Sequence, residues 1–146
     1  MDTIQLPQDF REFLKLFNSK KVEYLVIGGY AVGYYGYPRP TGDLDIWISN
    51  APDNAERARA ALEEFGFNCP INVLLNDNEV ARMGIPPFRI EVLTTIDGVN
   101  FSDCYTERVT ADVSGVEMSL ISLPRLKENK KASGRSKDIT DLEHLP

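Results

Sequence analysis

The sequence contains little cysteine and little histidine, and this scarcity excludes two kinds of small protein. Cys69 and Cys104 are the only cysteines, no CxxC pair occurs, and His144 is the single histidine. Zinc modules and disulfide scaffolds need such residues in clusters at short spacing. We therefore expect two buried thiols in a reducing compartment. We expect His144 to interact with the end of the last helix rather than to act in catalysis.

Long hydrophobic runs are also missing. The longest stretch without a charged residue covers residues 24–38, which is 15 residues, and four of them are glycines. A helix that spans a membrane needs about 20 apolar residues, so this stretch does not predict one. The first ten residues carry an acid at position 2 and lack a basic region followed by an apolar one. We expect a cytoplasmic protein without a membrane partner.

The composition that is present fits one folded domain over residues 1–146. Hydrophobic residues make up 42% and charged residues 26%, which is typical of soluble globular proteins. The net charge of −6 argues against a protein that coats nucleic acid or binds a membrane surface. One segment departs from this acidity: residues 125–137 carry a single acid, Glu128, against six basic residues, which are Arg125, Lys127, Lys130, Lys131, Arg135 and Lys137.

Hydrophobic periodicity predicts alternating helices and strands. The predicted helices are Gln8–Asn18, Tyr30–Tyr35, a helix capped within residues 50–53 that ends at Phe65, Ser122–Ala132, and a last helix capped by Ser136. The predicted strands are Val22–Ile27, Leu44–Ile48, Ile71–Leu75, Phe88–Leu93 and Val116–Ile121. Gly66 and Gly134 are expected to end the helices that precede them. This alternation predicts an α/β or α+β fold, and it leaves the order of the strands open.

Asp43 and Asp45 are the first residues that point to chemistry. They alternate with Leu44 and Ile46 in the segment DLDIWI, so the two carboxylates share one face of a strand. Two adjacent carboxylates repel each other unless a cation lies between them, and Mg²⁺ prefers such hard oxygen ligands. The pair therefore indicates a metal site, although a solvated strand face is the alternative when the pair is considered alone.

Gly28 and Gly29 follow the strand that ends at Ile27. Paired glycines at a strand-to-helix turn let backbone N–H groups come close to a phosphate, and a helix N-terminus favours anions. Arg39 and Thr41 can add a guanidinium and a hydroxyl to the same phosphate. An ordinary tight turn is the alternative for the two glycines.

These features together resemble the DNA polymerase beta-like nucleotidyltransferase superfamily. Its pattern places two glycines after a strand, two alternating acids on the next strand and a third acid on a later strand. The segments GGYAVGYYGYPRPTGDLDIWI and ISLPRLKENKKASGRSKDITDLEHL are similar to small bacterial nucleotidyltransferase-like proteins related to abortive-infection toxins. The resemblance extends from Val22 to Leu145. It implies a minimal nucleotidyltransferase fold, in which helices flank a mixed β-sheet and a helical segment forms the C-terminal part.

The resemblance also implies a third metal carboxylate, which in this sequence is Glu91, where the family usually has aspartate. Considered alone, Glu91 is an acid that could pair with Arg89 on the same strand face. The closing motif implies that Lys130 or Arg135 reaches the triphosphate. The alternative is that Asp138 holds Arg135 in a structural ion pair.

The function implied by this family is metal-dependent transfer of a nucleoside monophosphate from a nucleoside triphosphate to an acceptor hydroxyl. Asp43, Asp45 and Glu91 are then the catalytic and metal-binding residues for two Mg²⁺ ions, which Mn²⁺ can replace. Phosphate binding is expected from six residues: Gly28, Gly29, Arg39, Thr41, Lys130 and Arg135. The acceptor stays open between an RNA end, a protein hydroxyl and a small molecule.

Two other functions share these motifs. One is a catalytically weak or inactive nucleotide-binding module that regulates a toxin–antitoxin pair, which the short chain and Glu91 in place of aspartate favour. The other is a nucleotidyltransferase that modifies a small antibiotic. Association of two chains to form an acceptor groove also stays open.

Overall fold

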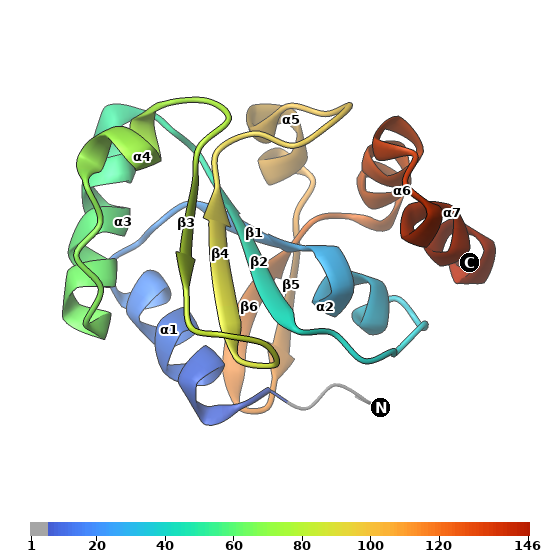
Figure 1. The fold of residues 1–146 in the computed structure, drawn as a ribbon, viewed down its shortest axis with the longest axis horizontal. Coiled ribbons are helices and arrows are strands. Elements are labelled where there is room, and N and C mark those ends of the chain that lie inside the picture. The colour runs from blue at the N-terminus through green and yellow to red at the C-terminus, as the bar shows by residue number, and fades with distance from the viewer. Residues whose placement is uncertain (1–5) are drawn as a thin grey trace.

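The computed structural model describes residues 6–146 and has a mixed α+β fold (Figure 1). The six strands form one sheet in the order β3-β4-β2-β1-β6-β5. Their bounds are β1 Tyr24–Ile27, β2 Asp43–Ile48, β3 Val80–Met83, β4 Arg89–Leu93, β5 Val109–Val113 and β6 Val116–Leu120. The helices are α1 Gln8–Ser19, α2 Gly28–Tyr34, α3 Pro52–Phe65, α4 Ile71–Leu75, α5 Phe101–Thr106, α6 Leu123–Ser133 and α7 Ser136–His144.

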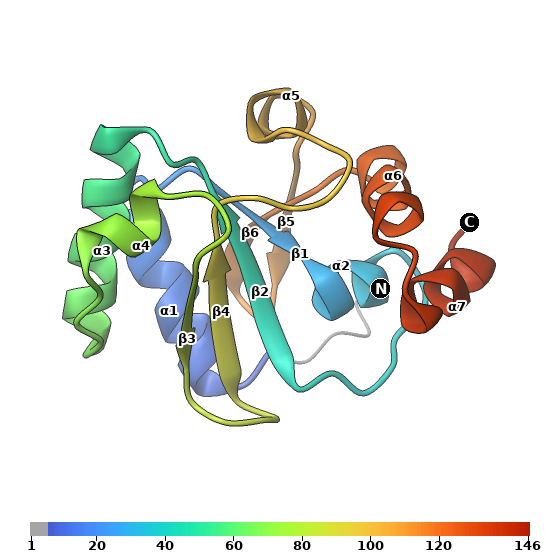
Figure 2. The ribbon, with the colours of Figure 1, turned by 45° about the horizontal axis from the view of Figure 1, so that its top comes forward.

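The helices lie on both sides of this sheet. Figures 1 and 2 show α1, α3 and α4 on one side of the strands and α2, α6 and α7 on the other. The buried hydrophobic side chains form one core cluster, to which α1 contributes Phe10, Phe13, Leu14 and Phe17. Within residues 6–146, no helix combines the length and the apolar character needed to cross a membrane.

Strand β2 lies inside the sheet and has two different faces. Leu44, Ile46 and Ile48 are fully buried on one face, while Asp43 and Asp45 project from the other. β2 pairs in parallel with β4, and the register places Asp45 opposite Glu91. Side chains in register on neighbouring strands share a face, so this pairing brings the third carboxylate to the first two.

The predicted strand Ile71–Leu75 is wrong, because these residues form the short helix α4. Pro70 precedes the segment with φ near −60°, and only Leu74 is fully buried, which suits a single helical turn against α3 better than a strand. A short apolar run without alternation fits either a strand or a helix. The next segment of the chain, Val80–Met83, forms strand β3 instead. The sequence analysis did not predict β3, α5 or β5.

The predicted helix ends are partly confirmed. Ser122 caps α6, while Gly66 and Gly134 adopt the left-handed conformation that ends α3 and α6. The first residue of α7 is Ser136, but its cap is Arg135, whose backbone N–H donates to the Asp138 carboxylate. Cys69 and Cys104 are free and buried, as expected.

One further start agrees with the prediction and one differs. The N-cap of α3 is Ala51, within the predicted residues 50–53. Helix α2 starts at Gly28 and not at Tyr30, so both glycines lie in its first turn.

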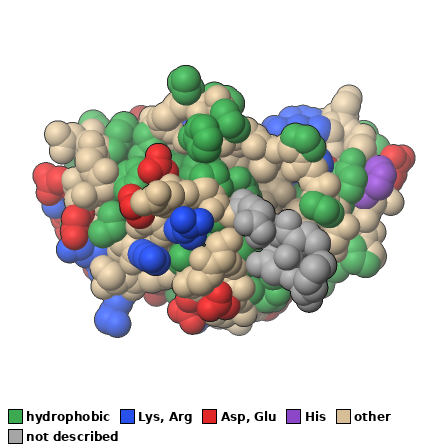
Figure 3. Space-filling model, turned by 90° about the horizontal axis from the view of Figure 1, so that it is seen from below, with side chains coloured by type: hydrophobic (Ala, Val, Ile, Leu, Met, Phe, Trp, Pro, Cys, Tyr) green, Lys and Arg blue, Asp and Glu red, His purple; other side chains and the backbone are tan. Residues whose placement is uncertain are grey.

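The turn between β3 and β4 exposes apolar side chains at the edge of the sheet. Ile85 is 76% exposed and Phe88 is 54% exposed. Hydrophobic side chains protrude over this turn at the top of Figure 3. The turn lies next to the start of β2, since the Arg89 N–H donates to the Gly42 carbonyl.

Asn54 joins α3 to the sheet. Its Oδ1 accepts the Glu23 N–H at 2.7 Å, and its amide donates to the carbonyls of Glu23 and Ser49 at 3.1 and 2.8 Å. The side chain is buried. It therefore satisfies three backbone groups where β1 begins and β2 has ended.

We predict that Asn54→Ala lowers the free energy of unfolding by about 2–3 kcal/mol, because the part-buried Glu23 N–H and Ser49 carbonyl lose the partner that Asn54 provides. Urea denaturation measures this. Asn72→Ala, at an exposed position of α4, is the matched control and should change the free energy by less than about 0.5 kcal/mol. Equal effects of the two substitutions would contradict the assigned role.

Candidate functional site

One cleft gathers every residue that the sequence analysis selected. It has a volume of about 590 Å³ and lies between the sheet, the segment before β2 and α6. Its lining includes all nine predicted residues: Gly28, Gly29, Arg39, Thr41, Asp43, Asp45, Glu91, Lys130 and Arg135. The lining also includes Lys137, which the sequence analysis did not select, although it belongs to the basic segment.

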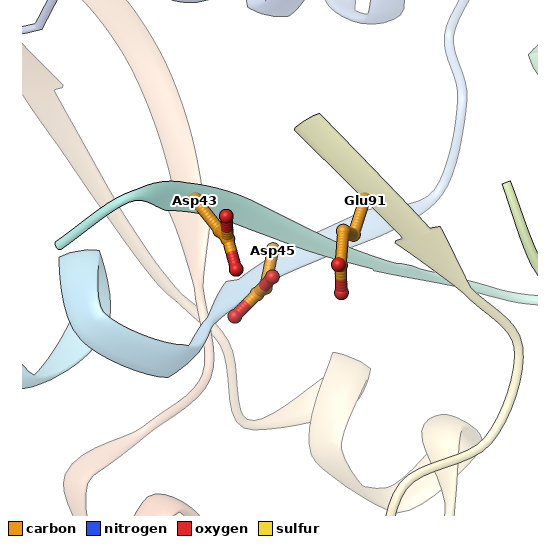
Figure 4. Close-up of side chains that lie close together, drawn as sticks. All are labelled: Asp43, Asp45 and Glu91. Atoms are coloured by element: carbon orange, nitrogen blue, oxygen red, sulfur yellow. The ribbon is translucent and has the colours of Figure 1, made fainter. Parts of the chain in front are cut away.

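The three predicted metal ligands lie together in this cleft. Asp43 and Asp45 extend from β2, and Glu91 extends from β4 toward the same side (Figure 4). One carboxylate oxygen from each residue lies within 4.8 Å of the other two. Hard oxygen donors at this spacing could hold a divalent cation such as Mg²⁺ or Mn²⁺.

Asp45 is the most confined of the three carboxylates. Its Oδ1 is buried and has no hydrogen-bond partner within residues 6–146. The pKa of Asp45 is raised to about 6, first by burial and then by the charges of Glu91 and Asp43, while Lys137 and Lys130 act to lower it. A buried oxygen without a donor costs free energy, which a bound cation would offset. The site therefore fits a metal ion.

The two glycines have a steric reason to be present. A Cβ at Gly28 would lie 2.3 Å from Asp45 Oδ2, and a Cβ at Gly29 would lie 2.6 Å from Thr41 Oγ1. Gly28 also has φ of +68°, which side chains rarely adopt. The absence of side chains thus lets β2 and the segment before it pack directly against the start of α2. Phosphate binding by these glycines stays a prediction.

Arg39 and Thr41 form the wall of the cleft beside these glycines. Arg39 donates from Nε and Nη2 to the two carboxylate oxygens of Asp141, both at 2.8 Å. Its Nη1 lies 3.4 Å from the position of a Cβ at Gly29. Thr41 donates its hydroxyl to the Asp43 carbonyl at 3.2 Å. Asp141 therefore fixes one side of the guanidinium, and the Nη1 side faces the turn of glycines.

Lys130 is buried in a network of charges between α6 and α7. Its Nζ lies 3.1 Å from Asp138 and 3.0 Å from Asp141, and Arg135 pairs with Asp138 at 2.8 Å. Although burial alone would raise the pKa values of the two aspartates, hydrogen bonds from Arg135, Arg39 and Lys130 hold them below their ordinary values. Lys130 thus borders the cleft while its charge is engaged by two carboxylates.

The structural ion pair of Arg135 with Asp138, which the sequence analysis kept as the alternative, is present. Arg135 also borders the cleft, and 62% of its side chain is exposed. The expected pairing of Glu91 with Arg89 is present as well, at 3.4 Å. The sequence analysis missed the stronger partner of Arg89, which is Asp43.

His144 Nδ1 donates a hydrogen bond to the Thr140 carbonyl at 2.9 Å, and the ring stacks on Tyr37 at a centroid distance of 4.0 Å. It lies in the last turn of α7, as expected, and it does not line the cleft.

No protein-family model and no curated protein matches this chain.

We predict that Asp45→Asn makes the metal-free protein more stable above pH 6. A carboxyl whose pKa rises on folding stabilises the fold only as the neutral acid, so native stability falls as pH rises from about 4 to about 6. The uncharged amide avoids this loss. The difference in unfolding free energy should grow over that window and then stay at about 2–3 kcal/mol.

Urea titrations of both proteins from pH 4 to pH 8 with a chelator measure this difference. Asp9→Asn, which changes an exposed acid in the first turn of α1, is the control and should give no gain over the same window. A gain that does not change with pH would contradict the prediction.

We predict that Lys130→Met destabilises the fold by about 3 kcal/mol, because it leaves buried carboxylates with less compensating charge. Lys131→Met, at the adjacent exposed position, is the matched control and should shift stability by less than about 0.5 kcal/mol. Thermal unfolding followed by circular dichroism compares the two. Similar melting temperatures would show that the network contributes little.

Proposed function

We propose that this protein is a metal-dependent nucleotidyltransferase that moves a nucleoside monophosphate from a nucleoside triphosphate to an acceptor hydroxyl. The observation that carries the proposal is the meeting of Asp43, Asp45 and Glu91 in one cleft, with a buried oxygen on Asp45 that has no hydrogen-bond partner among residues 6–146. The resemblance to the polymerase beta-like superfamily in the same residues supports it.

The carboxylates form the metal-binding part of the proposed site. Asp43 and Asp45 would hold two divalent cations, with Glu91 near the one on the acceptor side. Bound cations supply two kinds of chemistry in such sites, activation of the attacking hydroxyl and stabilisation of the leaving pyrophosphate. Glu91, which is partly exposed at the cleft, would accept the proton of the acceptor hydroxyl.

The glycine turn and the segment before β2 would hold the triphosphate. Gly28 and Gly29 offer backbone close to the cleft, Thr41 offers a hydroxyl, and Arg39 presents its Nη1 beside them. A guanidinium that is already fixed by Asp141 needs little reorganisation to bind phosphate. Arg135 and Lys137 add positive charge from the other rim.

Lys130 contributes to the proposed site through its partners. Because its Nζ pairs with Asp138 and Asp141, it fixes the aspartate that orients Arg39. This differs from the direct contact with the triphosphate that the sequence motif implied. The positive charge of Lys130 still favours the ionised form of Asp45.

The reaction would proceed without a covalent enzyme intermediate. The acceptor oxygen forms a bond to the α-phosphorus, and the bond from that phosphorus to the bridging oxygen of the β-phosphate breaks. Pyrophosphate leaves with the electron pair, and the hydroxyl proton passes to a carboxylate. Positioning and electrostatic stabilisation provide the rate enhancement. An RNA end, a protein hydroxyl or a small molecule can serve as the acceptor in this scheme.

A second function, nucleotide binding without turnover, has one observation in its favour. Arg89 covers both oxygens of Asp43, and Arg82 lies 3.0 Å from Glu91, so arginines already occupy two of the carboxylates. A regulatory module of a toxin–antitoxin pair would need the cleft but not the reaction.

We predict that the purified protein transfers label from nucleoside triphosphates to an acceptor in the presence of Mg²⁺ or Mn²⁺. Asp45→Asn should lower the rate at least about 100-fold, because a charged ligand is removed from the reaction centre. Mixed RNA, protein and small-molecule acceptors, separated after incubation with labelled triphosphates, provide the measurement. Asp9→Asn is the control and should keep the native rate.

Metal-dependent binding of triphosphate in calorimetry without any transfer would favour the regulatory module. If the protein binds neither metal nor triphosphate, both proposed functions are refuted.

A further inference from the structure

Arg89 lies directly on the carboxylates that the proposed function assigns to metal. Its Nε donates to Asp43 Oδ1 at 2.9 Å and its Nη2 to Asp43 Oδ2 at 3.1 Å. The same Nε lies 3.4 Å from Glu91 Oε2. The guanidinium therefore bridges a ligand on β2 and a ligand on β4, and both oxygens of Asp43 accept from it.

The backbone explains why the guanidinium is there. The parallel register of β2 and β4 places Arg89 opposite Asp43, and Glu91 follows two residues later on the same face. Arg82 comes to the cluster from the other neighbour of β4, because β3 places it opposite Glu91. Its Nε donates to Glu91 Oε2 at 3.0 Å, and 59% of its side chain is exposed.

A divalent cation and Arg89 would need the same oxygen atoms. A bidentate guanidinium uses one in-plane lone pair of each carboxylate oxygen, so a cation that binds Asp43 must share the same two oxygens with it. The two positive charges would also repel each other at short distance. Asp45 is different, because its Oδ1 has no partner within residues 6–146.

We propose that Arg89 is a built-in competitor of the metal, which neutralises Asp43 and Glu91 in the metal-free protein and must leave Asp43 when a cation binds. This inference rests on the metal site of the proposed function and adds a regulatory contact to it. Arg89 then lets three carboxylates lie close together in the metal-free protein, and its contact with Asp43 lowers the affinity of the site for the cation. Arg82 acts in the same direction but more weakly, because it contacts Glu91 alone and is more exposed.

The opposite role for Arg89 predicts an opposite result. If Arg89 were a positioning residue that holds Asp43 in the conformation for metal binding, its removal would weaken the binding of the cation. If Arg89 competes with the cation, its removal strengthens binding. The sign of the change in affinity therefore distinguishes the two roles, and the measurement does not require an active enzyme.

The experiment measures Mn²⁺ affinity by electron paramagnetic resonance and calorimetry in the native protein and in three variants of the two arginines. Arg89→Gln is expected to bind Mn²⁺ about tenfold more tightly, which corresponds to loss of an ion pair worth roughly 1.4 kcal/mol. Arg82→Gln should gain about threefold at most, because an exposed single contact contributes less. Arg89→Lys, which keeps the charge, should stay closer to the native affinity than Arg89→Gln.

Two further variants control the measurement. Arg59→Gln removes the same charge from an ion pair on α3 and should leave the affinity unchanged. Combining Asp45→Asn with Arg89→Gln should abolish the tightened binding, which places the bound Mn²⁺ at the cluster. The rise in melting temperature on adding Mn²⁺ should be larger for Arg89→Gln than for the native protein, and this readout also shows that the variant folds.

The outcomes separate this inference from the proposed function. If the native protein binds Mn²⁺ through Asp45 and Arg89→Gln binds it equally or less tightly, the competitor role is overturned and the metal site stands. If neither protein binds Mn²⁺ at millimolar concentration, both the metal site and the inference built on it are overturned.

Discussion

Repulsion among three carboxylates on two adjacent strands is the interaction that the other charged side chains of the site compensate. The parallel register of β2 and β4 brings Asp43, Asp45 and Glu91 together, and burial prevents water from screening Asp45 fully. Arginines compensate the charge from one side of the cluster, while Lys130 and Lys137 favour ionised Asp45 from the other. Such a balance of opposite charges around a partly buried cluster is common at functional sites.

The basic segment 125–137 offers less unpaired positive charge in the folded protein than its sequence suggested. Arg125 pairs with Glu107 and Glu128, while Lys130 and Arg135 pair with aspartates of α7. Much of the positive charge is therefore compensated within the protein. The net charge of −6 argues against a protein that coats nucleic acid. Lys137 and Arg135 line the cleft, and 62% of the Arg135 side chain is exposed.

Local patterns predicted the strand DLDIWI and the five helices α1, α2, α3, α6 and α7 to within about two residues at their starts. They also selected Gly28, Gly29, Arg39, Thr41, Asp43 and Asp45 of the cleft, whereas Glu91, Lys130 and Arg135 came from the family resemblance. They failed at Ile71–Leu75, where a short apolar run had no period, and at β3 and β5, which are short edge strands. Local sequence patterns did not predict contacts between residues that are far apart in the sequence. The pairing of β2 with β4 and the ion pair of Arg39 with Asp141 depend on topology, which no local pattern contains.

The bond between Arg39 and Asp141 joins residues that are 102 positions apart. During synthesis the ribosome makes Arg39, the glycine turn and all three carboxylates long before it makes residue 141. The guanidinium of Arg39 therefore has no carboxylate to hold it until residue 141 has left the ribosome. The wall of the cleft becomes complete only when α7 has docked, so an unfinished chain would hold the acidic cluster without the ordered arginine that faces it.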